Sequence, residues 1–137
     1  MTEPAFPIAR LKARPDFLEA AKALSCARGA VVLQARDRAD DQPLVRVGFT
    51  ATKRVGGSVI RNRAKRRMRE AAAALIPLLA RPGHDYVLIA RGGARTRPWA
   101  RLLDDVKSAL LRLAADRTAP HVSGPAPSPV GNPRPRT

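Results

Sequence analysis

The segment 53–69 combines a glycine break, a helical pattern and a dense run of cations, and it constrains the fold more than any other part of the chain. After Gly56-Gly57, Ser58 is a suitable N-cap for a helix over residues 59–76, and Pro77 either ends this helix or opens a short continuation. On an ideal helix the apolar residues of this stretch form one narrow stripe. That stripe, which we expect to pack on a sheet, consists of Ile60, Ala64, Met68, Ala71 and Leu75.

The remaining surface of the predicted helix is almost entirely cationic, and the segment 53–69 contains no acidic residue before Glu70. An ordinary solvated helix face mixes both signs of charge, so that neighbouring side chains compensate one another. Here an external polyanion has to provide the compensation, and arginine side chains can bind phosphate oxygens in a bidentate manner. We therefore predict nucleic-acid contact through Lys53, Arg54, Arg61, Asn62, Arg63, Lys65, Arg66 and Arg69, with Arg63 and Arg67 bordering the apolar stripe.

The whole chain carries a formal net charge of +15, with 26 Lys and Arg against 11 Asp and Glu. Such a field attracts nucleic acid or an anionic membrane. A membrane partner is the weaker option, because no apolar run approaches the roughly 18 to 20 residues of a spanning helix and the start of the chain lacks the apolar core of a signal peptide. A single cysteine, Cys26, excludes an internal disulfide and a cysteine-based zinc cluster. We expect a soluble cytoplasmic protein.

The length of 137 residues predicts one domain. Residues 1–8 are expected to form a flexible leader and residues 9–117 the RNA-binding domain. Residues 118–137 contain six of the 13 prolines and few large apolar side chains, which predicts a disordered, basic, Pro-rich tail.

The remaining pattern alternates helices and strands. Residues 9–24 suggest a short helix that Asp16 can cap, and a final helix begins near Thr96, a suitable cap. Strands are predicted over 31–36, 44–52 and 85–91. In the second strand Val45, Val47, Phe49 and Ala51 share one face, and Arg46, Gly48, Thr50 and Thr52 share a half-polar face.

The sequence offers no set of residues for protein-side catalysis. His84 lies in a predicted turn and His121 in the predicted tail, so that a paired acid and base is not expected. The neighbouring acids Asp104 and Asp105 point in different directions on a helix, and Asp40-Asp41 lie in a loop. Neither pair supplies the converging carboxylates of a two-metal phosphodiesterase, and we expect no catalytic residue and no metal ligand in the protein.

Two consecutive stretches, 47–56 and 59–70, resemble the signature of the bacterial ribonuclease P protein component, with Arg61-Asn62-Arg63 as its RNR motif. Arg10-Leu11-Lys12, Asp16-Phe17, Ile89-Ala90-Arg91 and the closing helix follow in the expected order, so that the resemblance covers about residues 9–114. The chain departs from the family at Ser58, where an asparagine is frequent, and at Ala21, where some members carry a second aromatic residue.

The resemblance implies an α/β (α+β) fold, a single small domain with the order αβββαβα. It further implies a four-stranded mixed sheet, a left-handed βαβ crossover around the basic helix and a very short first strand near 25–27.

The resemblance also implies a function: the protein subunit of ribonuclease P, which removes the 5′ leader of precursor tRNA. The catalyst would be the RNA subunit with its bound Mg²⁺, and the partners would be that RNA and the leader, with no protein partner implied. The leader would be held by Phe17, Arg46 and Arg91.

Other interpretations remain open at this stage. Phe17 is equally suited to core packing, and Arg46 and Arg91 to ion pairs. The basic helix alone also fits a non-catalytic ribosomal or RNA-assembly protein. A DNA-binding helix is a weaker alternative, because the sequence shows no dimerisation face.

Overall fold

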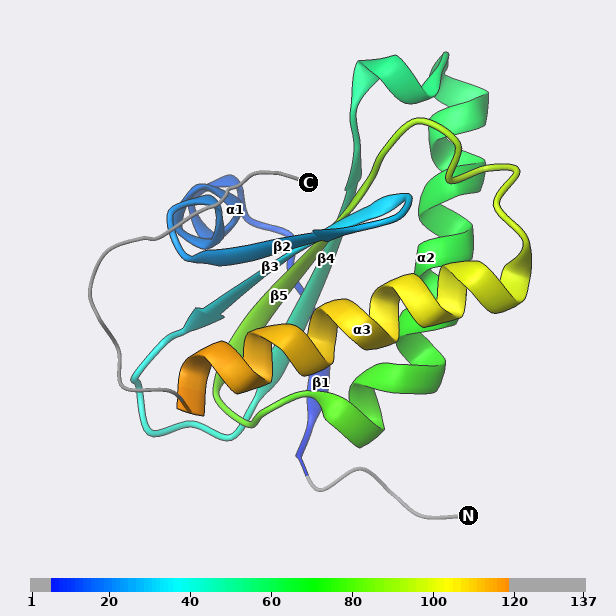
Figure 1. Cartoon of the computed structure of the whole chain (residues 1–137). Helices are drawn as coiled ribbons and strands as arrows, with labels where there is room; N and C mark the ends of the chain where they lie inside the picture. Colours follow the sequence, from blue (N-terminus) through cyan, green and yellow to red (C-terminus); the bar gives the residue numbers. More distant parts are fainter. Residues whose placement is uncertain (1–5, 119–137) are drawn as a thin grey trace.

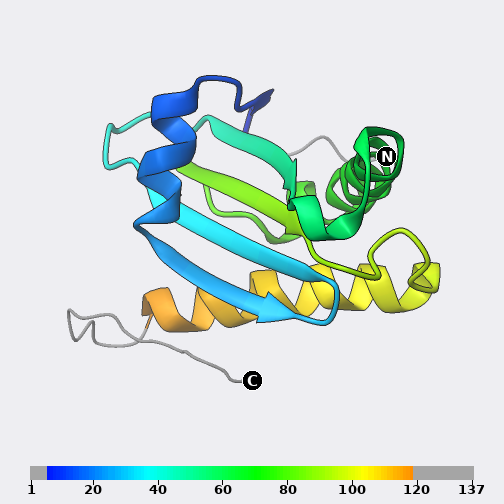
Figure 2. The same cartoon turned by 90° about the horizontal axis from the view of Figure 1, so that it is seen from above.

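A computed structural model describes residues 6–118 as three layers, with α2 and α3 on one face of a sheet and α1 on the other (Figures 1 and 2). The sheet has five strands in the order β1-β4-β5-β3-β2. β1 and β5 both run parallel to β4, and the β5–β3 and β3–β2 pairs are antiparallel. The elements are β1 (Ile8–Arg10), α1 (Arg14–Ala21), β2 (Leu24–Arg28), β3 (Val31–Asp37), β4 (Val45–Ala51), the 3-10 turn η1 (Lys53–Val55), α2 (Ser58–Leu79), β5 (His84–Ala90) and α3 (Trp99–Thr118).

The mixed α+β class is confirmed, but the sheet contains one strand more than expected. β1 pairs with β4 from Ile8↔Val45 onward, and the Leu11 N–H donates to the Val47 carbonyl at 2.9 Å. The boundary predicted at residue 9 falls inside β1. Phe6, before this strand, is buried in the main core. The helix predicted over 9–24 is correspondingly shorter. The strand implied near 25–27 is present as β2.

The main core lies between the sheet and the helices α2 and α3. Val45 and Val47 are buried there, and Phe49 and Ala51 pack against the same cluster, which confirms the predicted apolar face of β4. The stripe of α2 is wider than expected: Ala72 and Ile76 are buried together with Ala64, Met68 and Ala71, whereas Leu75 is half-buried.

Three predicted helix caps are wrong. Asp16 lies in the first turn of α1, where Ala13 is the N-cap, and Ser58 is the first helical residue after Gly57. Thr96 lies in a turn before α3, which begins at Trp99. The question at Pro77 is answered by α2, which contains Pro77 in its last turn and ends two residues later at Leu79.

α2 connects two parallel neighbours, β4 and β5, and therefore forms the crossover of a βαβ unit. This connection places the start of α2 just beyond the carboxyl end of β4. The left-handed sense of the crossover stays an expectation.

A fully buried carboxylate, Asp85, lies on the α1 side of the sheet and is bound by arginines. Arg46 donates to both of its oxygens, from Nε at 2.8 Å and from Nη2 at 2.7 Å, and Arg38 donates from Nη1 at 2.8 Å. Arg36 approaches within 3.5 Å. The hydrogen bonds to Asp85 are the main reason why the pKa of Arg46 is raised. For Arg38, burial alone would lower the pKa, but hydrogen bonds to Asp40 and Asp85 outweigh it and the pKa is raised.

We expect Asp85→Asn to lower the free energy of unfolding by about 3 to 5 kcal/mol, because it leaves the nearly buried Arg38 side chain and two partly buried arginines without their shared counter-charge. Urea unfolding followed by circular dichroism would measure the change. Asp40→Asn is the matched control: it removes a carboxylate that also pairs with Arg38, at 2.9 Å, but is largely exposed. Similar stabilities for Asp85→Asn and the unmodified protein would contradict this role of Asp85.

Candidate nucleic-acid interface

The outward side of α2 carries the predicted cations in parallel lines along the helix. Arg61, Lys65 and Arg69 recur every four residues and are half-exposed. Asn62 and Arg66 form a second line and are exposed, as is Arg63. Arg66 approaches Glu70 at 3.6 Å, but both side chains are more than half exposed, so that this pair compensates little of the charge. We name this set the α2 ridge: Arg61, Asn62, Arg63, Lys65, Arg66 and Arg69.

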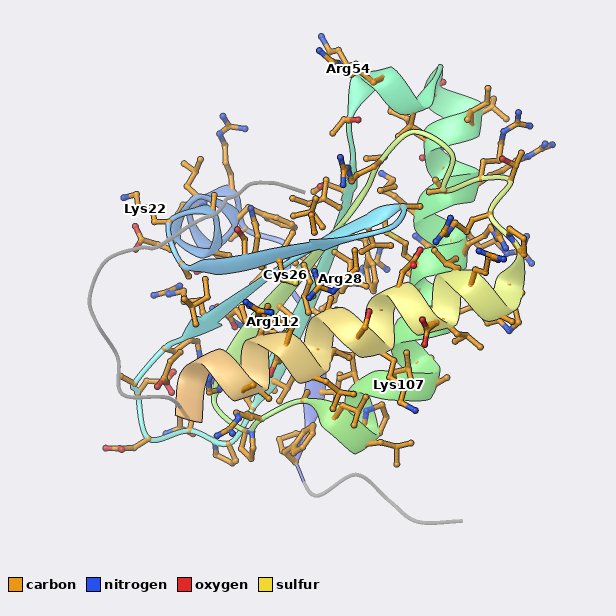
Figure 3. All side chains as sticks on the ribbon, viewed as in Figure 1. Lys22, Cys26, Arg28, Arg54, Lys107 and Arg112 are labelled. Atoms are coloured by element: carbon orange, nitrogen blue, oxygen red, sulfur yellow. The ribbon has the colours of Figure 1, made fainter. Side chains whose placement is uncertain are left out.

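A second group of cations surrounds a hollow at the carboxyl ends of β4 and β5. The hollow measures about 590 Å³ and is lined by Thr52, Lys53, Arg54, Arg91 and Gly92. Its two sides are joined by a hydrogen bond from the Thr52 N–H to the Ala90 carbonyl at 3.4 Å. Figure 3 shows Arg54 extending away from the body of the fold beyond β4. The sequence assigned Lys53 and Arg54 to one group and Arg91 to another; the parallel strands bring all three together.

Phe17 lies over the half-polar face of β4. A Cβ atom built on Gly48 would be 2.6 Å from the Phe17 ring atoms Cε1 and Cζ, so that the ring occupies the space that glycine leaves. Phe17 is half-buried and packs with a small cluster on this face that includes Leu11, Ala20 and Val87. The ring is therefore both a packing residue and partly accessible.

The row of the sheet next to Phe17 and Gly48 is only partly covered. Strand register aligns four residues across it on the α1 side: Thr50, Ile89, Val32 and Ala27. The first three are half-buried and Ala27 is exposed. Thr50 and Ile89 in this row lie two residues before Thr52 and Arg91, which line the hollow. A partly exposed strip of sheet therefore connects Phe17 with Arg91.

Arg46, predicted to bind a ligand on this face, makes contacts within the fold. Its guanidinium binds Asp85 and donates to Asp16 at 3.1 Å. These carboxylates are shared with other arginines, and the Arg46 side chain stays partly exposed, so that its assignment to the leader stays a prediction. In the fold, Arg46 ties β4 to the first turn of α1, which carries Phe17.

The structure gives Arg67 a role that the sequence did not indicate. Its Nη1 donates to the carbonyls of Ala94 at 2.8 Å and Arg95 at 2.9 Å, and its Cζ lies 6.0 Å from the centre of the Trp99 ring. The loop it holds also presents Arg95, which is exposed and was not predicted. The only sequence signal for this contact was the position of Arg67 at the border of the apolar stripe.

Two further acids, Asp105 and Asp40, make structural contacts. Asp105 is buried, accepts two hydrogen bonds from Arg97 at 2.7 and 3.0 Å and one from the Ala30 N–H at 3.1 Å, and the bonds to Asp105 raise the pKa of Arg97. The pKa of Asp40 is lowered, chiefly by its hydrogen bond from Arg38. Among residues 6–118 no group of three His, Cys, Asp or Glu side chains could hold a metal ion, and no helix is long and apolar enough to cross a membrane.

These features define a small α+β domain with a cationic surface along one helix and across the adjacent strand ends. The family model of ribonuclease P matches residues 7–114, and the chain belongs to the ribonuclease P protein family. A ribonuclease P protein component from Caulobacter vibrioides is 70% identical over 107 residues, which cover 78% of this chain and 72% of the relative. The one from Ruegeria pomeroyi is 49% identical over 112 residues, covering 80% and 90%.

Solved structures show the same fold. The ribonuclease P protein from Thermotoga maritima superposes with a TM-score of 0.58 at 27% identity, covering 76% of this chain and 93% of that one. The protein from Staphylococcus aureus gives a TM-score of 0.62 at 24% identity, covering 77% and 94%.

We expect Gly48→Ala to lower the free energy of unfolding by about 1 to 3 kcal/mol, because the added methyl group displaces the Phe17 ring. Gly92→Ala is the matched control, since a Cβ there meets no atom within 4 Å. Urea unfolding of both variants would measure the difference. Equal stabilities would show that Phe17 does not pack on Gly48.

Proposed function

We propose that this chain is the protein subunit of the ribonuclease P ribonucleoprotein and promotes removal of the 5′ leader from precursor tRNA. The RNA subunit would supply catalysis, with Mg²⁺ bound mainly by that RNA. Family membership supports the assignment to ribonuclease P.

The observation that carries the proposal is the uncompensated charge of the α2 ridge. The helix holds these cations on a rigid scaffold that rises about 6 Å for every four residues, and a single acid, Glu70, accompanies them on α2. A rigid row of guanidinium groups suits a sugar–phosphate backbone, because each arginine can donate two parallel hydrogen bonds to a phosphate. We therefore assign the α2 ridge, with Lys53 and Arg54, to the structured RNA.

We assign the leader to the strip of sheet between Phe17 and Arg91. A partly exposed aromatic ring can stack on any base, so that a single-stranded segment of variable sequence would be accepted. Arg91, which lines the hollow, would neutralise a leader phosphate at the other end of the strip.

The chemistry of the protein's own carboxylates agrees with a non-catalytic subunit. Asp85 and Asp105, the buried acids of the described residues, are engaged by arginines, and their oxygens accept hydrogen bonds that fix the fold. A general base has to be within reach of the proton that it removes, which these buried groups are not. The protein would therefore bind and orient RNA.

Reconstitution with the cognate ribonuclease P RNA tests the proposal. At low Mg²⁺ the protein is expected to increase the rate of precursor tRNA cleavage, and less so for a substrate whose leader is a single nucleotide, because that substrate cannot reach Phe17. The protein without the RNA is the control for a contaminating nuclease. Binding without any stimulation would overturn the proposal and favour a non-catalytic RNA-assembly protein.

We expect Arg66→Ala to weaken binding to this RNA with little sequence dependence and to reduce the slope of log K against log salt by about 1, as for the loss of one phosphate contact. Titrations at several salt concentrations would measure the slope. Lys107→Ala is the control, because it removes an exposed cation from α3 rather than from the α2 ridge (Figure 3). An unchanged slope for Arg66→Ala would place Arg66 outside the interface.

A further inference from the structure

The loop between β5 and α3, residues 91–98, is a second cationic segment beside α2 (Figure 1). It contains three arginines and the pair Gly92-Gly93. Arg91 and Arg95 are exposed, whereas Arg97 is bound to Asp105. Two exposed arginines of this loop therefore lie on the side of the fold that also carries α2.

Despite its glycines, the loop is held at both ends. The Arg91 N–H donates to the Ala30 carbonyl at 2.8 Å, which ties the start of the loop to the β2–β3 hairpin. At the other end Arg97 binds Asp105 on α3, and the same carboxylate accepts the Ala30 N–H. The ends of the loop therefore share one anchor, the turn around Ala30.

The middle of the loop is held by the basic helix itself. Ala94 is fully buried, and one nitrogen of Arg67 donates to the successive carbonyls of Ala94 and Arg95. The position of the guanidinium over Trp99, the first residue of α3, adds a cation–π contact. Arg67 thus points from the cationic segment 53–69 toward the protein, and its contacts are with backbone carbonyls.

We infer that Arg67 is a positioning residue that sets the loop 91–95 against α2, so that Arg95 adds a phosphate contact to the α2 ridge. The inference rests on the proposed function for the identity of the RNA. The two carbonyl groups that Arg67 binds belong to Ala94 and to Arg95 itself. The hydrogen bonds from Arg67, a residue of α2, therefore set where the backbone of Arg95 lies relative to that helix.

Arginine and lysine differ in a way that separates positioning from direct contact. A lysine keeps the positive charge, but its compact ammonium group lacks the planar fork and the flat face that stacks on an aromatic ring. If Arg67 contacted a phosphate directly, Arg67→Lys would therefore leave the salt slope of RNA binding unchanged. If Arg67 positions the loop, the same variant would reduce the slope.

A double-mutant cycle on the full-length protein tests this, with the cognate ribonuclease P RNA as the probe. Arg95→Ala is expected to reduce the salt slope by about 1. Arg67→Lys is expected to give the same reduction, and the double variant no further reduction, because the loop is already released. Arg101→Lys, a charge-conserving change at an exposed residue of α3 outside the α2 ridge, is the control and is expected to keep the slope.

Hydrogen exchange provides a readout of the loop itself. The amides of Ala94 and Thr96, which donate to the Arg91 and Gly93 carbonyls, are expected to exchange faster in Arg67→Lys, while the Leu102 amide at the start of α3 keeps its protection. This comparison separates release of the loop from a general loss of stability.

Three results would overturn the inference: an unchanged slope in Arg67→Lys, additive reductions in the double variant, or unchanged exchange of the loop amides. A protein that binds the RNA and obeys the cycle without stimulating cleavage would overturn the proposed function alone. A protein that does not bind the RNA would overturn both.

Discussion

The parallel pairing of β4 with β5 is the constraint on which the other features depend. Parallel neighbours need a long connection, and here that connection is α2, whose buried stripe closes the core. Because both strands end at the same edge, residues that follow them, Lys53 and Arg91, line one hollow although they are far apart in the sequence. The α2 ridge begins directly beyond that hollow. One backbone register thus creates both parts of the cationic surface.

The chain divides its arginines between folding and binding by where it places its carboxylates. Asp85 engages Arg36 from β3, Arg38 from the turn after β3 and Arg46 from β4. Asp105 engages Arg97. These carboxylates are buried, where pairing is required to offset the cost of desolvation. The α2 ridge has Glu70 alone as an acidic neighbour on its helix, and that pair is exposed. The excess charge is therefore concentrated on a solvated helix, where a polyanion can reach it without disturbing the core.

The sequence predicted those elements in which apolar side chains recur at helical or strand spacing. The stripe of α2 and the two faces of β4 follow from apolar spacing, and both are confirmed in substance. β1 was missed because three exposed residues show no alternation, and backbone bonds to β4 alone create the strand. The ion-pair partners of Arg46 were missed for another reason. Strand alternation gives the face on which a side chain lies, but Asp85 and Asp16 come from other elements, and only the fold shows that they occupy it.

Arg67 shows why a run of like charges cannot be interpreted residue by residue. By spacing it sits at the edge of the apolar stripe, where either a solvent or a protein partner is possible. The partner comes from the loop after β5, some 27 residues away, and consists of carbonyl groups that no sequence pattern marks. A cationic segment can therefore contain an arginine, here Arg67, that binds the protein's own backbone and positions its neighbours. The binding contribution of such a residue would be measured through Arg95, its neighbour in space, because the guanidinium of Arg67 is already bound.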